Sequence, residues 1–172
     1  MKYARMFLVA VVAVAVFSGM VYAQTAGVFQ LPFDPGQQWN IPSCTQVGFT
    51  NKSPSGQIFM EFNDEVNSRT GLPINAYHLA EDWNGKCGGS TDRYAPLYAI
   101  AEGVVVRADM SLDQGGHLLI RHDLPNGDSR YMLYEHVNDI VVSSGRVSKG
   151  QLVAHIGNGN GAWEYHLHFE MR

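Results

Sequence analysis

Residues 117–136 read HLLIRHDLPNGDSRYMLYEH, and this stretch decides the fold class. Two apolar runs, at 117–122 and 129–136, lie on either side of a Pro-Asn-Gly-Asp sequence at 125–128. Asn-Gly between apolar runs is a strong hairpin signal, because this pair adopts the tight turn that matches the twist of two antiparallel strands. The stretch therefore predicts two paired β-strands.

Short apolar runs between turn residues continue along the rest of the second half. The chain has 18 Gly and 7 Pro, and few of its stretches show helical periodicity. This pattern is typical of an all-β domain built mainly from antiparallel sheets. Further strands are expected within 97–107, on both sides of a Glu-Gly turn at 102–103, and at 140–142, 151–156 and 165–171. One helix is expected, at Gln57–Ser68.

The first 23 residues have the features of a secretory signal. Lys2 and Arg5 precede an unbroken apolar run at 6–17, and the Val-Tyr-Ala sequence at 21–23 is typical of a cleavage site. The run is shorter than the roughly 20 apolar residues that span a bilayer, which favours a cleaved signal over a membrane anchor. We therefore expect a periplasmic or secreted protein with no stable membrane insertion after the signal is removed.

The length and charge of the exported chain limit its organisation and its partners. Removing 23 of 172 residues leaves 149, which suits one domain with one core. Lys2 and Arg5 leave with the signal, so ten basic residues face 16 acidic ones and the formal net charge is −6. An acidic chain has no general attraction for nucleic acid or anionic membranes. We expect a monomer that binds no nucleic acid.

Cys44 and Cys87 are the two cysteines of the chain. In an exported protein an even pair predicts a disulfide, which would tie the amino-terminal segment to the second half. The alternative is two buried free thiols. Neither cysteine has a second Cys or His at zinc-knuckle spacing, which argues against a role in metal binding.

The histidines of the last predicted strand are candidates for metal chemistry. Residues two apart in a strand share one face and lie about 6.6 Å apart along the chain. His166 and His168 therefore project together, while Leu167 and Phe169 point the other way. One imidazole is then placed to bind a metal and the other to reach a water or the substrate. A His-x-His pair alone is a weak signal, so a second group of ligands is required.

The sequence His78-Leu79-Ala80-Glu81-Asp82 supplies that group. Imidazole and carboxylate are both good zinc ligands, and a four-residue spacing lets them converge from a helical turn or a bent loop. The following Trp-Asn-Gly at 83–85 favours the loop. Three protein ligands leave one position open, which is typical of a catalytic zinc site. His136, at the end of a predicted strand, then becomes a candidate catalytic group.

Three motifs occur in a fixed order: His78-Leu79-Ala80-Glu81-Asp82, Tyr134-Glu135-His136 and His166-Leu167-His168-Phe169-Glu170. With these motifs, the chain from about Ala76 to Arg172 resembles the LytM- and lysostaphin-type zinc endopeptidases. The resemblance implies a hybrid-motif, β-sandwich-like fold with a metal in a groove across the sheet. It implies one zinc ion held by His78, Asp82 and His168, with His136 and His166 as the catalytic histidines. Relatives usually continue past this last strand, whereas the present sequence stops at Arg172.

The resemblance also divides the chain and predicts its function. Residues 1–23 are the signal, 24–75 an amino-terminal segment partly packed on the catalytic domain, and 76–172 the metallopeptidase domain. The predicted activity is hydrolysis of peptide bonds in peptidoglycan stem peptides or cross-bridges. The alternatives are a metal-free relative that activates a wall amidase and a secreted peptidase that acts on proteins or small peptides.

The choice of the catalytic acid and base depends on a motif that the chain lacks. It has no His-Glu-x-x-His motif, so the usual glutamate base of many zinc proteases is absent. His136 and His166 are the best acid–base pair, and the sequence does not say which is the base. His117, His122 and His155 match no ligand pattern and are interpreted as structural. The Gly-rich stretch 157–161 precedes a strand rather than a helix, so it is interpreted as a groove wall and not as a phosphate loop.

Overall fold

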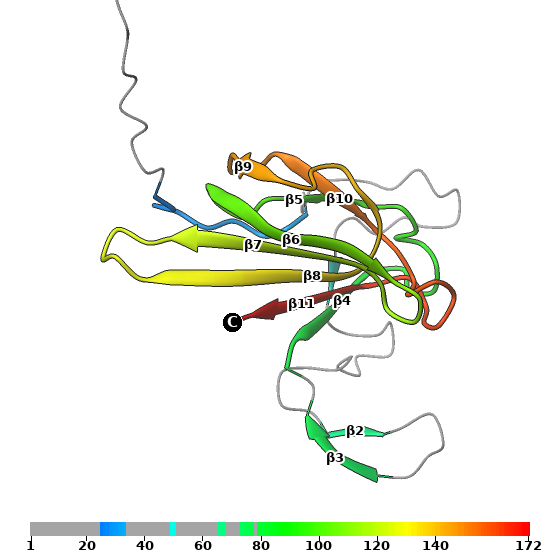
Figure 1. Ribbon diagram of the computed structural model, residues 1–172. Helices are drawn as coiled ribbons and strands as arrows, with labels where there is room; N and C mark the ends of the chain where they lie inside the picture. The colour runs from blue at the N-terminus through cyan, green and yellow to red at the C-terminus, as the bar shows by residue number, and fades with distance from the viewer. Residues whose placement is uncertain (1–24, 34–48, 51–64, 68–72, 78) are drawn as a thin grey trace, which may run out of the picture.

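The computed structural model describes residues 25–33, 49–50, 65–67, 73–77 and 79–172, and every element in these ranges is a strand (Figure 1). The first four strands are β1 (Phe49–Thr50), β2 (Glu65–Asn67), β3 (Pro73–Tyr77) and β4 (Glu81–Gly85). The next four are β5 (Pro96–Tyr98), β6 (Gly103–Ser111), β7 (Gly115–Asp123) and β8 (Ser129–Ile140). The last three are β9 (Gly145–Val147), β10 (Leu152–Ile156) and β11 (Leu167–Met171). The predicted all-β class is confirmed.

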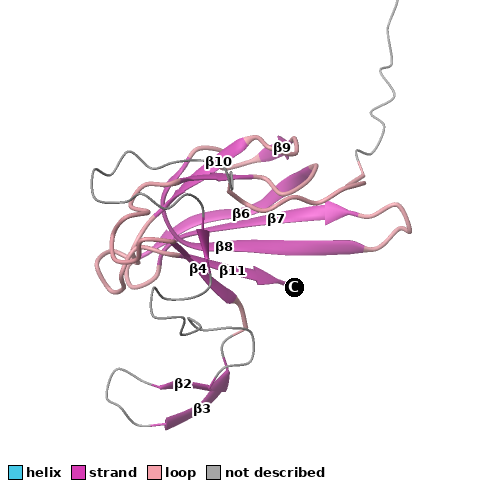
Figure 2. Cartoon of the chain, turned by 180° about the vertical axis from the view of Figure 1, so that it is seen from behind, coloured by secondary structure: helices cyan, strands magenta, loops and turns pink. Residues whose placement is uncertain are grey.

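Nine of these strands form one antiparallel sheet. Its main path runs β1-β4-β11-β8-β7-β6-β9, and β10 joins it by pairing with both β8 and β5. Figures 1 and 2 show β5, β9 and β10 on one side of the long hairpin β7–β8, with β11 and β4 on the other. The strands β2 and β3 form a separate two-stranded sheet. The carboxy-terminal strand β11 is therefore central, between β4 and β8, although it comes last in the chain.

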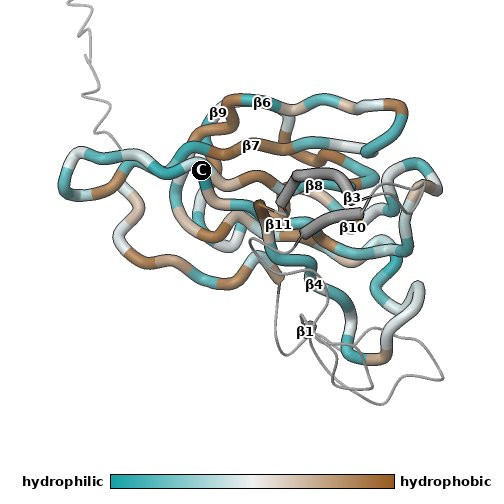
Figure 3. The backbone as a smooth tube through the Cα atoms, turned by 90° about the horizontal axis from the view of Figure 1, so that it is seen from below, coloured by the Kyte–Doolittle hydropathy of each residue, from teal (hydrophilic) through white to brown (hydrophobic). Residues whose placement is uncertain are grey.

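The core lies between the long strands and the β5–β10 layer. Leu118 and Ile120 of β7 face Tyr134 and Met132 of β8 in register, and Leu118, Ile120 and Tyr134 are fully buried. Burying an apolar side chain of this size contributes about 1.5–3 kcal/mol. The Tyr134 hydroxyl donates to the carbonyl of Tyr98 at 3.0 Å, so this buried polar group is satisfied. Figure 3 shows hydrophobic stretches in the central strands and polar residues along β4.

Residues 25–33 run along this domain. The amide of Ala26 donates a hydrogen bond to the carbonyl oxygen of Asp123 at 2.8 Å. The amide of Gln30 donates one to the carbonyl oxygen of Ile100 at 2.8 Å. Phe33 is buried in the core, where its ring lies 5.3 Å from that of Trp83. No helix in the described part of the chain has the length and hydropathy needed to cross a membrane. Residues 1–24, which include the predicted signal, lie outside the described ranges.

Three local predictions were wrong. Glu65–Asn67 is strand β2 and not part of a helix, while the rest of the predicted helix lies outside the described residues. The separate strand expected at 140–142 does not form, because β8 continues through Ile140 and ends there. Asp82 lies in strand β4 and not in a loop or helical turn. In the last case pairing with β1 and β11 overrides the turn propensity of the Asn-Gly pair at 84–85.

The loop after β4 contains a bonded cysteine and a buried carboxyl group. Cys87 is disulfide-bonded, as predicted, and its expected partner Cys44 lies outside the described residues. Asp92 is fully buried, and its carboxylate accepts a hydrogen bond from the amide of Gly85 at 3.0 Å. Burial raises the pKa of Asp92 to about 7, because the charged form loses its hydration there.

Candidate active site

Asp82 and His168 meet across the β4–β11 pair. They are direct partners in the antiparallel register, so their side chains lie on the same face. Alternation along β11 sends Leu167 into the core, where it is fully buried, and leaves His168 on the opposite face. Nδ1 of His168 lies 3.3 Å from Oδ1 of Asp82, and the two side chains are 14% and 13% exposed. Both side chains are thus largely shielded from water, with a small part of each still accessible.

His166 stands beside this pair, just before β11. A bridge to Gly157 holds its backbone, with the His166 amide donating to the Gly157 carbonyl at 3.3 Å. Its Nδ1 lies 2.8 Å from the carbonyl oxygen of Glu164. A carbonyl only accepts, so Nδ1 carries the proton and Nε2 keeps a free lone pair. Nε2 lies 3.8 Å from Oδ1 of Asp82, on the side where His168 also points.

His136 reaches the same place through a β-bulge. Gly116 pairs with Val137 and the next residue, His117, pairs with Glu135, so His136 is an extra residue in β8. Its φ is 63°, in the left-handed region that side chains rarely adopt. Regular alternation would send Glu135 and His136 to opposite faces. The bulge instead turns His136 toward the face that holds His166, and bulges next to active sites commonly redirect a side chain in this way.

Two glycines make room for the bulge. A Cβ on Gly157 would lie 2.2 Å from the carbonyl oxygen of His136, and one on Gly116 would lie 2.6 Å from that of Val137. Neither contact is compatible with a side chain, because backbone atoms cannot rotate away. The predicted groove wall at 157–161 therefore has a more definite role at its first residue: Gly157 lets β10 approach the bulge closely enough to fix His136.

The surroundings of His136 keep its ring neutral. Its Nδ1 lies 2.9 Å from the carbonyl oxygen of Gln114, which makes Nδ1 the protonated nitrogen. The ring centre is 4.8 Å from that of His166 and 5.6 Å from that of His168. Burial, reinforced by the neighbouring His166, lowers the pKa of His136 to about 3. Trp163 covers the ring from another side, at 5.9 Å between centres.

The donor atoms present are suited to a zinc ion. Zinc bonds of about 2.0–2.2 Å at tetrahedral angles place neighbouring ligand atoms about 3.3–3.5 Å apart. The 3.3 Å between Nδ1 of His168 and Oδ1 of Asp82 falls in this range. No group of three or more His, Cys, Asp and Glu side chains within the described ranges is arranged to hold a metal. The third predicted ligand, His78, lies outside them, so the predicted ligand set stays a prediction.

Sequence reasoning missed the groups behind His168. Glu135 is the register partner of His168 on β8, and His117 is the partner of Glu135 on β7. Glu135 approaches His168 to 3.6 Å and His117 to 3.1 Å. The interpretation of His117 as unrelated to the site is therefore too simple. Strand pairing is the signal that finds it, and a single strand's sequence does not contain that information.

The other two histidines have contacts away from the site. His122 is fully buried, and its Nδ1 lies 2.8 Å from the carbonyl oxygen of Glu102. Burial lowers the pKa of His122, so the ring is a neutral packing group. His155 lies 3.3 Å from Asp139 beside a shallow pocket. These contacts agree with the structural role predicted for both.

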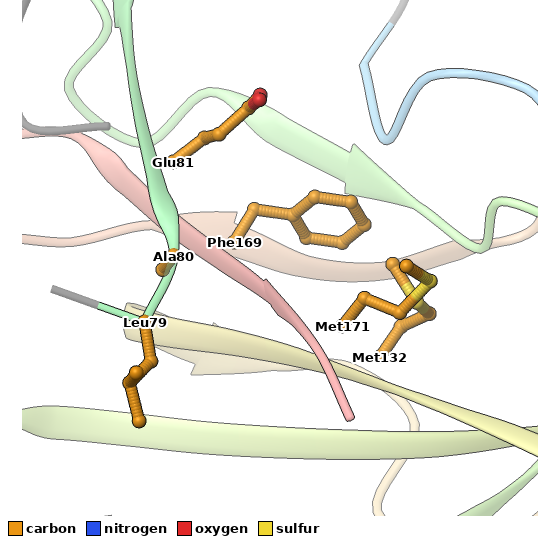
Figure 4. A pocket seen from close by; sticks show the side chains of 6 residues that line it. All are labelled: Leu79, Ala80, Glu81, Met132, Phe169 and Met171. Atoms are coloured by element: carbon orange, nitrogen blue, oxygen red, sulfur yellow. The ribbon is translucent and has the colours of Figure 1, made fainter. Parts of the chain in front are cut away.

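An apolar pocket lies on the opposite face of β11 from His168 (Figure 4). It has a volume of about 390 Å³ and is lined by Leu79, Ala80, Glu81, Met132, Phe169 and Met171. Phe169 and Met171 alternate with His168 along the strand, so their side chains leave the sheet on the other side. The pocket is therefore separate from the histidine cluster and is not part of the candidate active site.

Comparison with known families places this fold and cluster of histidines among the peptidases. The sequence model of peptidase family M23 matches residues 87–172, half of the chain. The chain therefore belongs to peptidase family M23, which confirms the family predicted from the sequence. The match contains His136, His166 and His168 but begins after Asp82. Comparison with curated protein sequences found no match.

Several solved structures are similar to this chain. A zinc-containing peptidase from Vibrio cholerae is 20% identical, with a TM-score of 0.48, over 68% of this chain and 38% of that one. A chain of the SpoIIQ–SpoIIIAH pore-forming complex is 18% identical, with a TM-score of 0.50, over 65% of this chain and 73% of that one. A mutant catalytic domain of the prophage-encoded M23 protein EnpA from Enterococcus faecalis is 22% identical, with a TM-score of 0.46, over 66% of this chain and 80% of that one. The chain thus spans well under half of the Vibrio protein. At 18% identity, the likeness to the SpoIIQ–SpoIIIAH complex concerns the fold alone.

Proposed function

We propose that this protein is an exported zinc endopeptidase that hydrolyses peptide bonds in peptidoglycan stem peptides or cross-bridges. Membership of peptidase family M23 supports the peptidase class. The amino-terminal signal pattern supports a site of action outside the cytoplasm, where the wall lies. The observation that carries the proposal is the convergence of Asp82, His168, His166 and His136 on one face of the sheet, with the His168 and Asp82 atoms at zinc spacing.

Asp82 and His168 would hold the metal together with His78. A zinc ion, when bound there, polarises the scissile carbonyl and acidifies the attacking water. His168 presents Nδ1 toward Asp82, as a ligand must. Asp82 adds a negative charge, which attracts a zinc ion more strongly than neutral imidazole ligands alone would.

His136 and His166 would move the protons. In both rings Nδ1–H donates to a backbone carbonyl, so both present an unprotonated Nε2. One of them would accept a proton from the attacking water at its Nε2, and the imidazolium so formed would deliver that proton to the leaving amine. The other ring, with its own Nε2 unprotonated, would accept a hydrogen bond from the attacking water or the substrate. The backbone anchors fix the ring orientation before substrate binds, so little reorganisation is needed during the reaction.

Digestion of purified peptidoglycan by the exported protein tests this proposal. We expect new amino-terminal groups, identified by mass spectrometry, whose release stops with a chelator and returns with zinc. Metal analysis should find about one zinc per chain. If the protein binds zinc but cleaves only soluble peptides, the proposed peptidoglycan substrate is wrong and the assignment as a zinc peptidase still holds. If the protein binds no zinc and stimulates a wall amidase equally well with and without a chelator, the proposed enzymatic activity is wrong.

A further inference from the structure

A row of ionisable side chains crosses the sheet behind the candidate metal site. Asp82, His168, Glu135, His117 and Asp109 come from β4, β11, β8, β7 and β6, and each is the direct register partner of the next. Direct partners share a face and lie close together. Five strands thus contribute one residue each to a continuous polar row, and the candidate ligands stand at its β4 end.

The side chains in this row are in contact from end to end. Nε2 of His168 lies 3.6 Å from Oε2 of Glu135. The other carboxylate oxygen of Glu135 lies 3.1 Å from Nε2 of His117, and Nδ1 of His117 lies 2.9 Å from Oδ1 of Asp109. Arg107 pairs with Asp109 at the far end. The side chains of His168, Glu135 and His117 are only 14%, 17% and 11% exposed.

This row of side chains can decide which nitrogen of His168 carries the proton, because a neutral imidazole has two nitrogens and only one proton. His168 turns Nδ1 toward Asp82 and Nε2 toward Glu135. To bind a metal beside Asp82, Nδ1 must carry no proton, so the proton must sit on Nε2. A carboxylate at Nε2 favours that tautomer, and a carboxylate behind a ligating histidine also fixes the ring and makes it a stronger ligand.

Glu135 is better placed for this task than the other nearby carboxylate. Glu170 lies 4.0 Å from Nε2 of His168, but both of its oxygens are bonded to Arg172, at 2.7 and 3.0 Å. Glu135 is closer, and its second oxygen is held by His117. A carboxyl group that is only 17% exposed is costly to bury unless it has a partner, and His117 supplies that partner for Glu135.

We propose that Glu135 is a positioning residue, which sets the tautomer and orientation of His168, and that His117, itself held by Asp109, keeps Glu135 in place. This inference rests on the proposed function, because the tautomer has a use only if His168 binds a metal. None of these three residues needs to touch the substrate. Their effect reaches the reaction through His168 alone, which separates their role from that of His136 and His166.

Metal affinity is the first test. In the full-length exported protein, Glu135→Gln keeps the size of the side chain and removes its charge. We expect zinc to bind roughly 10- to 100-fold more weakly in competition with a chelator, as for other outer-sphere carboxylates. His117→Gln should lose part of this affinity. The double variant should lose no more than Glu135→Gln alone, because the two residues act in series. Glu170→Gln is the matched control and should bind zinc as the wild type does.

The tautomer of His168 is the second test, and it needs no metal. Long-range proton–nitrogen NMR of the apoprotein at pH 8 distinguishes an Nε2–H ring from an Nδ1–H ring. We expect Nε2–H in the wild type and a mixture in Glu135→Gln, with circular dichroism unchanged. An Nδ1–H ring in the wild type, or affinity and tautomer that do not respond to Glu135→Gln, would overturn the positioning role. A wild type that has the expected tautomer but binds no zinc overturns the proposed function and leaves the positioning of His168 standing.

Discussion

Adding one methyl group at Gly157 should disable the site without touching any proposed ligand. The new Cβ would lie 2.2 Å from the His136 carbonyl oxygen, 2.7 Å from the Asn138 amide nitrogen and 2.9 Å from the Val137 carbonyl carbon. All three are backbone atoms of the bulge, so no rotation of a side chain relieves the contact. Either β10 must move away from β8, or the bulge must open and carry His136 with it.

The size of the effect follows from the distance. Ordinary contact begins at 3.4 Å, so the nearest atom must move by about 1.2 Å. A misplacement of about 1 Å in a catalytic group costs roughly 10²-fold in rate. Overpacking of this kind destabilises a fold by about 1–3 kcal/mol. Gly157→Ala should therefore hydrolyse peptidoglycan about 10²-fold more slowly and unfold at lower urea, while Asp82 and His168 still bind zinc.

Three measurements decide whether this reasoning holds. They are the initial rate of amino-group release from purified peptidoglycan, the urea midpoint and the zinc content per chain. Gly27→Ala is the control, because a Cβ there meets nothing within 4 Å and should leave all three unchanged. Gly116→Ala should reproduce the Gly157 result from the other side of the bulge. A Gly157→Ala protein with the wild-type rate would refute the claim that β10 fixes His136.

Three further predictions concern the ligands, the catalytic histidines and pH. His168→Ala should lose zinc and hydrolysis together, measured by metal analysis and peptidoglycan digestion; retained zinc would remove it from the ligand set. His166→Ala should keep zinc and lose about 10²- to 10⁴-fold in kcat, and unchanged turnover would exclude it as a catalytic group. Asp92 stays protonated in the folded protein up to about pH 7, whereas the unfolded chain releases this proton near 3.8. The folded state therefore holds the extra proton in this window, so the stability of the wild type relative to Asp92→Asn should fall, by up to about 4 kcal/mol, from pH 4 to 7. Urea unfolding at several pH values measures this difference, and a difference that stays flat or grows with pH would contradict it.

The fold class and the motifs of the candidate site were open to prediction from local sequence. The Asn-Gly turn at 126–127 predicts a hairpin because its backbone preference is local. The His-x-His pair at 166 and 168 was expected to share a face because strand alternation is local too, although His166 itself lies just before β11. Ligand chemistry and the order of the motifs then indicate a metallopeptidase. The strand position of Asp82 was not predicted, since the Trp-Asn-Gly sequence after it favours a turn and only pairing with β11 makes it a strand.

Sequence by itself therefore determined the all-β class, the peptidase family and the residue types of the candidate site. Tertiary structure alone decided how these residues meet. The register of β4, β11, β8 and β7 places Asp82 beside His168 and puts Glu135 behind it, and the bulge turns His136 onto their face. Registers and bulges depend on which strands pair and on close backbone contacts such as that at Gly157. Those contacts join residues far apart in the chain, and no local pattern encodes them.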